Sequence, residues 1–137
     1  MFFAPTVNSY KRFQPDSWAP TAVAWGLDNR TCGLRLVGHG QGYRVESRIP
    51  GADANPYLAI AASLLCGYIG MVEGINPSAP VVGRGYERRN LRLPLTIEDA
   101  LERMENSATI EKYLGKKFIT GYVAVKRAEQ ENYHRVI

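Results

Sequence analysis

The chain has 137 residues, of which 45% are hydrophobic and 22% are charged. This composition excludes an intrinsically disordered chain and suits one globular domain with an apolar core. Its formal net charge of +4 would allow binding to nucleic acid, but the basic residues are not gathered into one run, so the charge by itself supports such a partner only weakly. We expect a single α+β unit over residues 1–137, with strands in the first half followed by helices.

Three short segments in the first half have strand character. Residues 21–26, 32–37 and 43–49 are rich in β-branched or aromatic residues and are separated by turn residues. Because the connections are too short for a parallel crossover, antiparallel pairing is predicted. The glycine-rich run 38–42 joins two strands without opening a helix, so it predicts a hairpin connection and not a phosphate-binding loop.

A long uncharged helix is predicted next. Asn55 suits an N-cap, Pro56 suits the first helical position, and residues 57–72 carry no charge. A helix that is apolar on all sides is expected to be buried. The run is just long enough to raise a transmembrane helix, but its glycines, serine and alanines and its Asn-Pro start favour a buried helix of a globular fold. We therefore expect no membrane partner.

Three further helices are predicted in the second half. Residues 96–99 resemble a capping box that opens a helix through Met104. A break near residues 106–107 starts a second, short helix that ends at Gly115, which suits a C′ position. The last helix carries apolar residues at helical spacing, a pattern typical of a stripe that faces the core. These residues are Phe118, Tyr122, Val125 and Ala128.

The cysteines and histidines indicate no metal site. Cys32 and Cys66 lie far apart without metal-ligand spacing, and we expect both to be free, buried thiols. His39 and His134 are expected at the surface. The chain opens directly on apolar residues and stops with helical periodicity still running, so we expect both ends to be cut from a longer chain, with apolar surface left bare.

The most informative segment for chemistry is residues 43–49. The two-residue period of a strand places Arg44, Glu46 and Arg48 on one face, so that guanidinium groups flank a carboxylate. One interpretation is a solvated ladder of salt bridges that contributes little energy. The other is a site where the carboxylate holds a divalent cation and the arginines grip phosphate or carboxylate oxygens. Further arginines precede the segment: Arg12, Arg30 and Arg35.

Four motifs, read in order, resemble those of the glutamine synthetase family. They are residues 8–12 (NSYKR), 28–30 (DNR), 44–48 (RVESR) and 54–58 (ANPYL), and the resemblance covers nearly the whole chain. It identifies the chain as the C-terminal part of the catalytic domain. The resemblance implies ATP-dependent formation of a γ-glutamyl phosphate, which ammonia or an amine then attacks. It also implies ATP and Mg²⁺ or Mn²⁺ as cofactors, a cytoplasmic location, and a homo-oligomer, as a ring dodecamer for the full-length protein.

The same resemblance gives roles to individual residues. Arg12 and Arg48 would bind the carboxylates of glutamate, and Glu46 would ligate the metal. These roles agree with the strand-face pattern, because phosphoryl transfer depends on positioning and charge neutralisation. The family's other metal ligands would lie outside this chain, so we expect no turnover from the chain alone. Three further arginines would hold the ATP phosphates and the transferring phosphoryl group: Arg30, Arg35 and Arg44. Of these, Arg30 would act in catalysis.

The chain departs from the family pattern in the loop of residues 13–20, which corresponds to the flap that closes over glutamate. Ammonia-using members carry there a glutamate that binds and deprotonates ammonium, and Trp18 occupies that position. An indole cannot act as this base, but its π face can receive an alkylammonium group. Trp18 therefore predicts a catalytic site for a larger amine, such as a polyamine or an ethanolamine-like compound. The alternative is a loop shifted by a residue or two, with Asp16 in the glutamate's place.

A second departure affects one nucleotide contact. The stretch between Arg35 and Arg44 is shorter than in common bacterial members, and the lysine usual there has no clear counterpart, with Gln41 nearest. Two rival functions also fit the sequence: a basic module that binds nucleic acid or other anions, with strongly salt-dependent affinity, and a catalytically dead family member. Our main expectation is a ligase acting on glutamate and ammonia or an amine, with no nucleic-acid partner.

Overall fold

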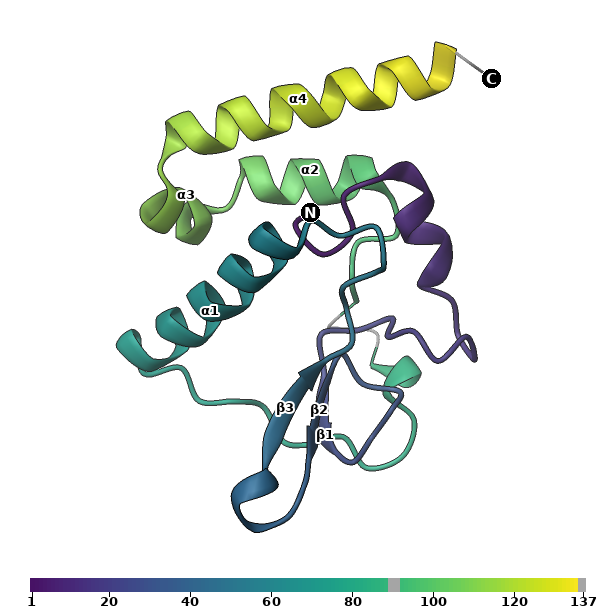
Figure 1. Cartoon of the computed structure of the whole chain (residues 1–137), viewed down its shortest axis with the longest axis vertical. Coiled ribbons are helices and arrows are strands. Elements are labelled where there is room, and N and C mark those ends of the chain that lie inside the picture. Colours follow the sequence, from purple (N-terminus) through teal and green to yellow (C-terminus); the bar gives the residue numbers. More distant parts are fainter. Residues whose placement is uncertain (89–91, 136–137) are drawn as a thin grey trace.

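The computed structural model describes residues 1–88 and 92–135, and it has the mixed α+β architecture that the sequence predicts (Figure 1). The sheet lies at one end of the molecule, α2 and α4 lie together at the other, and α1 crosses between them. The elements in chain order are η1 (Val7–Arg12), β1 (Trp25–Leu27), β2 (Leu34–Val37), η2 (Gly40–Gly42), β3 (Arg44–Ser47), α1 (Pro56–Val72), η3 (Gly85–Glu87), α2 (Ile97–Glu105), α3 (Ala108–Leu114) and α4 (Lys116–Arg135), where η marks a 3₁₀ helix.

The three strands form one sheet in the order β1-β2-β3. β2 and β3 pair antiparallel through the predicted hairpin, in which Gly38 has φ 120° and a Cβ would overlap the carbonyl of Gly42. β1 pairs with β2 in parallel, so the prediction of antiparallel pairing throughout is wrong. Because β1 has only three residues and spans about 10 Å, the short link of residues 28–33 can carry the chain back to its start.

The predicted helix starts are confirmed. Asn55 caps α1, Thr96 caps α2 and Ser107 caps α3, each accepting hydrogen bonds from backbone N–H groups of the first turn. Gly115, at φ 80°, ends α3 as expected. These ends depend on residues close in sequence, which is why the sequence alone could locate them.

The main core lies between the N-terminal segment, α2 and α4. The face that α4 turns to this core differs from the predicted stripe: Ile119 and Val123 are buried, whereas Phe118 and Val125 are 41% and 57% exposed. A helix has several candidate apolar faces, and packing against α2 selected this one. The buried residues of this core are Ala4, Tyr10, Phe13, Ala19, Leu93, Ile97, Ala100, Leu101, Met104, Ile119 and Val123. A smaller core joins Ala22, Ala24, Cys32 and Val81.

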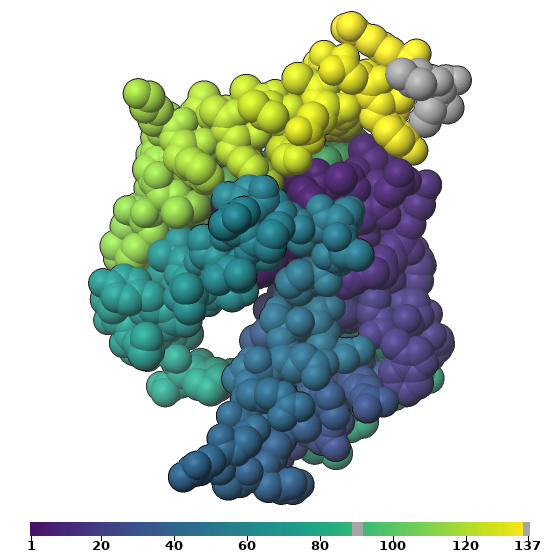
Figure 2. All heavy atoms as spheres, in the orientation of Figure 1, coloured from purple at the N-terminus to yellow at the C-terminus, as the bar shows by residue number. Residues whose placement is uncertain are grey.

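Helix α1 is exposed, which contradicts the prediction that it is buried. None of its residues is buried, and Leu64 is 70% exposed. Its composition favours burial, but the described chain covers it only in part: Tyr68 packs edge to face against Tyr113 of α3, with ring centroids 6.3 Å apart, and Glu73, at the end of α1, accepts hydrogen bonds from Lys112 and Tyr113. Between α1 and the sheet lies an apolar cavity of about 630 Å³, visible as an opening beside β3 in Figure 2. Cys66 lines this cavity and is exposed, whereas Cys32 is buried as expected; both thiols are free.

The surface histidines are confirmed, since His39 and His134 are both exposed. Within residues 1–88 and 92–135, no helix is long and apolar enough to cross a membrane.

Candidate active site

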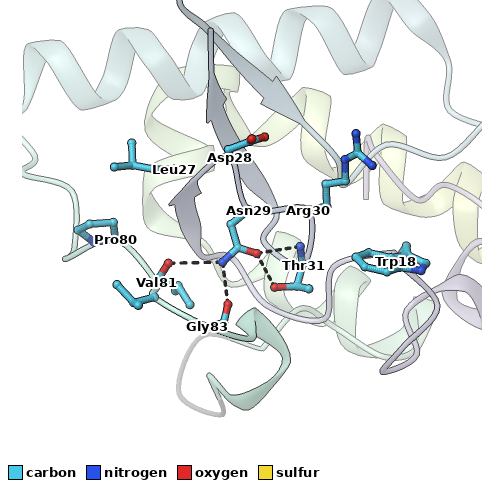
Figure 3. A pocket seen from close by; sticks show the side chains of 10 residues that line it. Trp18, Leu27, Asp28, Asn29, Arg30, Thr31, Pro80, Val81 and Gly83 are labelled. Carbon is cyan, nitrogen blue, oxygen red and sulfur yellow. Dashed lines mark hydrogen bonds between the residues drawn. The ribbon is translucent and has the colours of Figure 1, made fainter. Parts of the chain in front are cut away.

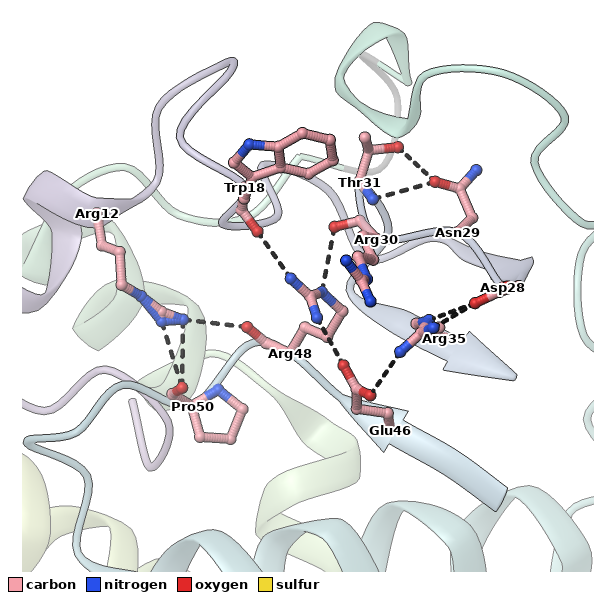
Figure 4. A network of polar contacts seen from close by, with 10 residues as sticks. All are labelled: Arg12, Trp18, Asp28, Asn29, Arg30, Thr31, Arg35, Glu46, Arg48 and Pro50. Carbon is pink, nitrogen blue, oxygen red and sulfur yellow. Dashed lines mark hydrogen bonds and ion pairs between the residues drawn. The ribbon is translucent and has the colours of Figure 1, made fainter. Parts of the chain in front are cut away.

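Glu46 lies at the centre of a polar network on one face of the sheet (Figure 4). Its register partner on β2 is Arg35, and directly opposite residues of an antiparallel pair share a face. Arg35 Nη1 lies 3.0 Å from Glu46 Oε2, and Arg48 Nη1 lies 2.6 Å from Glu46 Oε1. The hydrogen bond from Arg48, helped by the one from Arg35, lowers the pKa of Glu46 despite the opposing effect of desolvation. Glu46 is therefore an ionised carboxylate held between two guanidinium groups, with Arg35 in the place expected for Arg44.

Asp28 extends this network beyond Arg35. Its Oδ1 accepts a hydrogen bond from Arg35 Nε at 2.9 Å and forms an ion pair with Arg35 Nη2. The hydrogen bond from Arg35 lowers the pKa of Asp28, and the same bond raises the pKa of Arg35. This contact of Asp28 was not predicted from the sequence. Arg35 is therefore bonded to two carboxylates, those of Asp28 and Glu46. Its bond to Asp28 holds Arg35 in place, and Arg35 in turn orients Glu46.

Arg48 connects three segments of the chain. Besides its bond to Glu46, its Nε donates to the carbonyl of Arg30 at 3.1 Å, and its Nη2 donates to the carbonyl of Trp18 at 3.1 Å. One guanidinium therefore holds the end of β3, the link that carries Arg30 and the flap that carries Trp18. A planar fork with several donors is suited to such a junction.

Five of the predicted site residues surround one pocket. Trp18, Arg30, Arg35, Glu46 and Arg48 line a hollow of about 450 Å³. A neighbouring hollow of about 340 Å³ continues past Arg48 to Arg12 and the flap. Volumes of this order accommodate small ligands, and the basic walls suit an anion. The structure thus brings together most of the residues that the sequence singled out.

Arg30 and Arg44 differ from the other arginines. Arg30 lines the pocket, and in Figure 4 no hydrogen bond or ion pair joins its guanidinium to another residue drawn. Arg44 sits on the same strand face as Glu46 but opposite Val37, and it does not line the pocket. Its Nη1 donates weakly to the carbonyl of Gly42 at 3.4 Å. The nucleotide-binding roles of Arg30, Arg35 and Arg44 stay predictions.

The guanidinium of Arg12 is engaged with the backbone. Its Nη2 donates to the carbonyls of Arg48 at 3.0 Å, Ile49 at 2.7 Å and Pro50 at 3.2 Å. Desolvation lowers its pKa, and its Nε is buried without a hydrogen-bond partner in the described part of the chain. In this arrangement Arg12 fastens η1 to the segment that leaves β3. Its contact with glutamate stays a prediction.

Trp18 faces the pocket from the flap. Its side chain is 64% exposed, and it lines the hollows on both sides of Arg48. Its backbone has φ 61°, and its N–H donates to the phenol oxygen of Tyr86 at 3.1 Å. Asp16 lines neither hollow and forms an ion pair with Arg84. Asp16, the reacting carboxylate in the alternative of a shifted flap, thus lies outside both hollows, whereas Trp18 lines them.

Asn29 organises the loop beside the pocket (Figure 3). Its Nδ2 donates to the carbonyl of Gly83 at 2.8 Å, and its Oδ1 accepts from the backbone and the hydroxyl of Thr31 at 3.0 and 2.6 Å. These residues line a further hollow of about 480 Å³, with Trp18 and Arg30 at one end and Leu27 at the other. No local pattern in the sequence indicates Asn29's bond to Gly83, because the two lie 54 positions apart.

The residues present fit a divalent cation only in part. Within the described chain, no group of three or more His, Cys, Asp or Glu side chains comes together. Each oxygen of Glu46 accepts one hydrogen bond, and an ionised carboxylate offers about four acceptor positions. Glu46 can therefore supply one metal ligand while both arginines stay bound to it.

Comparison with known proteins gives a consistent result. The sequence matches the family described as "Glutamine synthetase, catalytic domain" over residues 1–137. Gamma-glutamylethanolamide synthetase GlnA4 of Streptomyces coelicolor is 42% identical over 100% of this chain and 30% of that protein. Gamma-glutamylputrescine synthetase PuuA of Escherichia coli is 40% identical over 98% of this chain and 29% of that protein. Several proteins named glutamine synthetase match at 33% to 38% identity.

Solved structures give the same fold. A chain described as "GmaS/ADP complex-Conformation 1" superposes with a TM-score of 0.81 at 30% identity, covering 98% of this chain and 33% of that chain. The present chain thus spans about a third of the length of the relatives it matches.

Proposed function

This chain belongs to the glutamine synthetase catalytic-domain family, and from that premise we propose that its site serves an ATP-dependent ligase that joins glutamate to an organic amine. The observation that carries the proposal is the position of Trp18, which faces the pocket lined by Arg30, Glu46 and Arg48. The pocket walls suit the anionic partners of the reaction, and the indole suits a cationic alkylamine.

Different charged residues of the pocket would bind different anionic groups of the reactants. When bound, ATP would supply the phosphoryl group that activates the side-chain carboxylate of glutamate, and Mg²⁺ or Mn²⁺ would neutralise its charge. Arg30, which lines the pocket, would bind oxygens of the phosphate chain. Glu46 would contribute one carboxylate oxygen to the metal while Arg35 and Arg48 keep it oriented. Arg48, which uses three of its five N–H groups, would offer the others to a carboxylate of glutamate.

Trp18 supports an amine larger than ammonia. A cation over an indole face is attracted by about 0.5–2 kcal/mol, and the alkyl part of an amine gains apolar contact that ammonium cannot make. A glutamate in this position would instead attract small cations by charge. The relatives named for ethanolamide and putrescine products agree with this proposal. We further propose that the full-length protein acts in the cytoplasm and forms a homo-oligomer.

The decisive experiment measures phosphate release by the full-length protein with ATP, Mg²⁺ and glutamate, comparing ammonium with a panel of polyamines, ethanolamine and small alkylamines. We expect release that depends on the organic amine and responds little to ammonium. The variant Trp18→Glu should shift the preference toward ammonium, while Trp25→Phe, a change at the chain's other tryptophan, should not. A wild-type preference for ammonium would contradict the proposal.

A further inference from the structure

The flap is held by a segment far away in sequence. Tyr86, in η3, accepts a hydrogen bond from the backbone N–H of Trp18 at 3.1 Å, and Arg84 forms an ion pair with Asp16. Each pair is separated by 68 positions. We call Arg84 and Tyr86 the clasp, because they contact alternate residues of the flap, Asp16 and Trp18. The clasp therefore acts on the part of the flap that contains the indole.

The backbone of Trp18 requires such support. Asp16 and Trp18 have φ 64° and 61°, in the left-handed region that disfavours residues other than glycine. Conformations of this kind persist when surrounding contacts hold them. At Trp18 the N–H donates to Tyr86 and the carbonyl accepts from Arg48, so both backbone polar groups are fixed. These two bonds fix the backbone from which the indole projects.

The clasp packs tightly against the link of residues 28–33. Gly85, between its two residues, is buried and donates its N–H to the hydroxyl of Thr31 at 2.7 Å. A Cβ at Gly85 would lie 2.7 Å from the carbonyl oxygen of Thr31, so only glycine allows this approach. The guanidinium of Arg84 lies over the ring of Tyr86, 5.5 Å from its centroid. The clasp thus rests on the link that carries Arg30, and it couples that link to the flap.

We infer that Tyr86 is a positioning residue that sets the orientation of Trp18 and thereby the selection of the amine. This inference rests on the proposed function for its kinetic consequence, but its structural part stands on the contacts alone. Tyr86 does not line the pocket that Trp18 faces, so it acts through Trp18 and not on the substrate.

The structural part is tested on the chain labelled with 5-fluorotryptophan, because its two tryptophans give separate ¹⁹F signals. Tyr86→Phe removes the acceptor of the Trp18 N–H and should shift or broaden the Trp18 signal while the Trp25 signal stays in place. Arg84→Gln should act in the same direction. The control Tyr57→Phe makes the same chemical change at a residue that is 84% exposed on α1, and it should move neither signal.

The kinetic part uses the full-length protein. Loss of one neutral hydrogen bond should raise the KM for the amine by roughly 2- to 10-fold, while the KM for ATP stays within about twofold. A purely structural role would instead lower kcat or the amount of folded protein with every KM unchanged. An unmoved Trp18 signal in Tyr86→Phe overturns the clasp whatever the substrate is. A wild-type protein that responds only to ammonium overturns the proposed function, and the positioning role is then judged by whether the same variant raises the KM for ammonium.

Discussion

Replacement of Arg12 by methionine should destabilise the fold even in the absence of any substrate. The guanidinium donates to the carbonyls of three successive residues, Arg48, Ile49 and Pro50, at distances down to 2.7 Å. Methionine fills a similar space but cannot donate, so these carbonyls lose their charged partner. The family resemblance predicts Arg12 as a ligand of glutamate, and a residue with that role alone would leave stability unchanged.

The magnitude follows from the contacts. A hydrogen bond to a charged group contributes about 1.5–3 kcal/mol, and water can replace part of it at a half-buried site. For three carbonyls that share one guanidinium we expect a loss of about 2–4 kcal/mol in the free energy of unfolding. In a domain of this size that corresponds to a fall in Tm of about 6–16 °C.

The matched control is Arg30→Met, because no hydrogen bond or ion pair joins the guanidinium of Arg30 to the other residues drawn in Figure 4. Its removal should change the stability by less than about 0.5 kcal/mol. Thermal unfolding of both variants and of the unmodified chain, followed by circular dichroism, compares their Tm values directly. Equal Tm values for Arg12→Met and Arg30→Met would refute the structural role of Arg12.

Two further predictions concern the network and the clasp. Because the bonds from Arg48 and Arg35 lower the pKa of Glu46 from its ordinary value of 4.5, its stabilising contribution is present above pH 4.5 and is lost as the pH falls through the lower, folded-state pKa. A ¹³C titration of the Glu46 carboxyl should therefore have its midpoint below 4.5, and Arg48→Gln should raise it; a midpoint at or above 4.5 in the parent would contradict the network. Gly85→Ala places a methyl group against the carbonyl of Thr31 and should cost about 1–3 kcal/mol in chemical denaturation. An unchanged denaturation midpoint would argue against the tight seat of η3.

The exposure of α1 shows that the composition of a helix does not by itself determine its burial. The uncharged run of residues 57–72 correctly predicts a helix, and its Asn-Pro start is where α1 begins. The same composition predicts burial, yet Leu64 is 70% exposed, and Ser63, Cys66 and Gly67 of α1 line a cavity of about 630 Å³. Hydrophobicity sets how much free energy burial would release, but burial also requires another surface to pack against, and the helix sequence carries no information about that surface.

The sequence by itself determined the features that depend on neighbouring residues. Asn55, Thr96 and Ser107 mark helix starts because a capping side chain bonds to N–H groups two or three residues away. The period of a strand likewise placed Glu46 and Arg48 on one face, because alternation follows from backbone geometry alone.

Only the tertiary structure decided which side chains meet. Arg35 reaches Glu46 because the register of β2 and β3 places them opposite each other, whereas Arg44 falls opposite Val37. The bond between Trp18 and Tyr86 spans 68 positions and depends on how η3 packs against the loop at Thr31. Strand register and loop packing are set by the sum of many distant contacts, so no local pattern in the sequence could specify the partners of the candidate site.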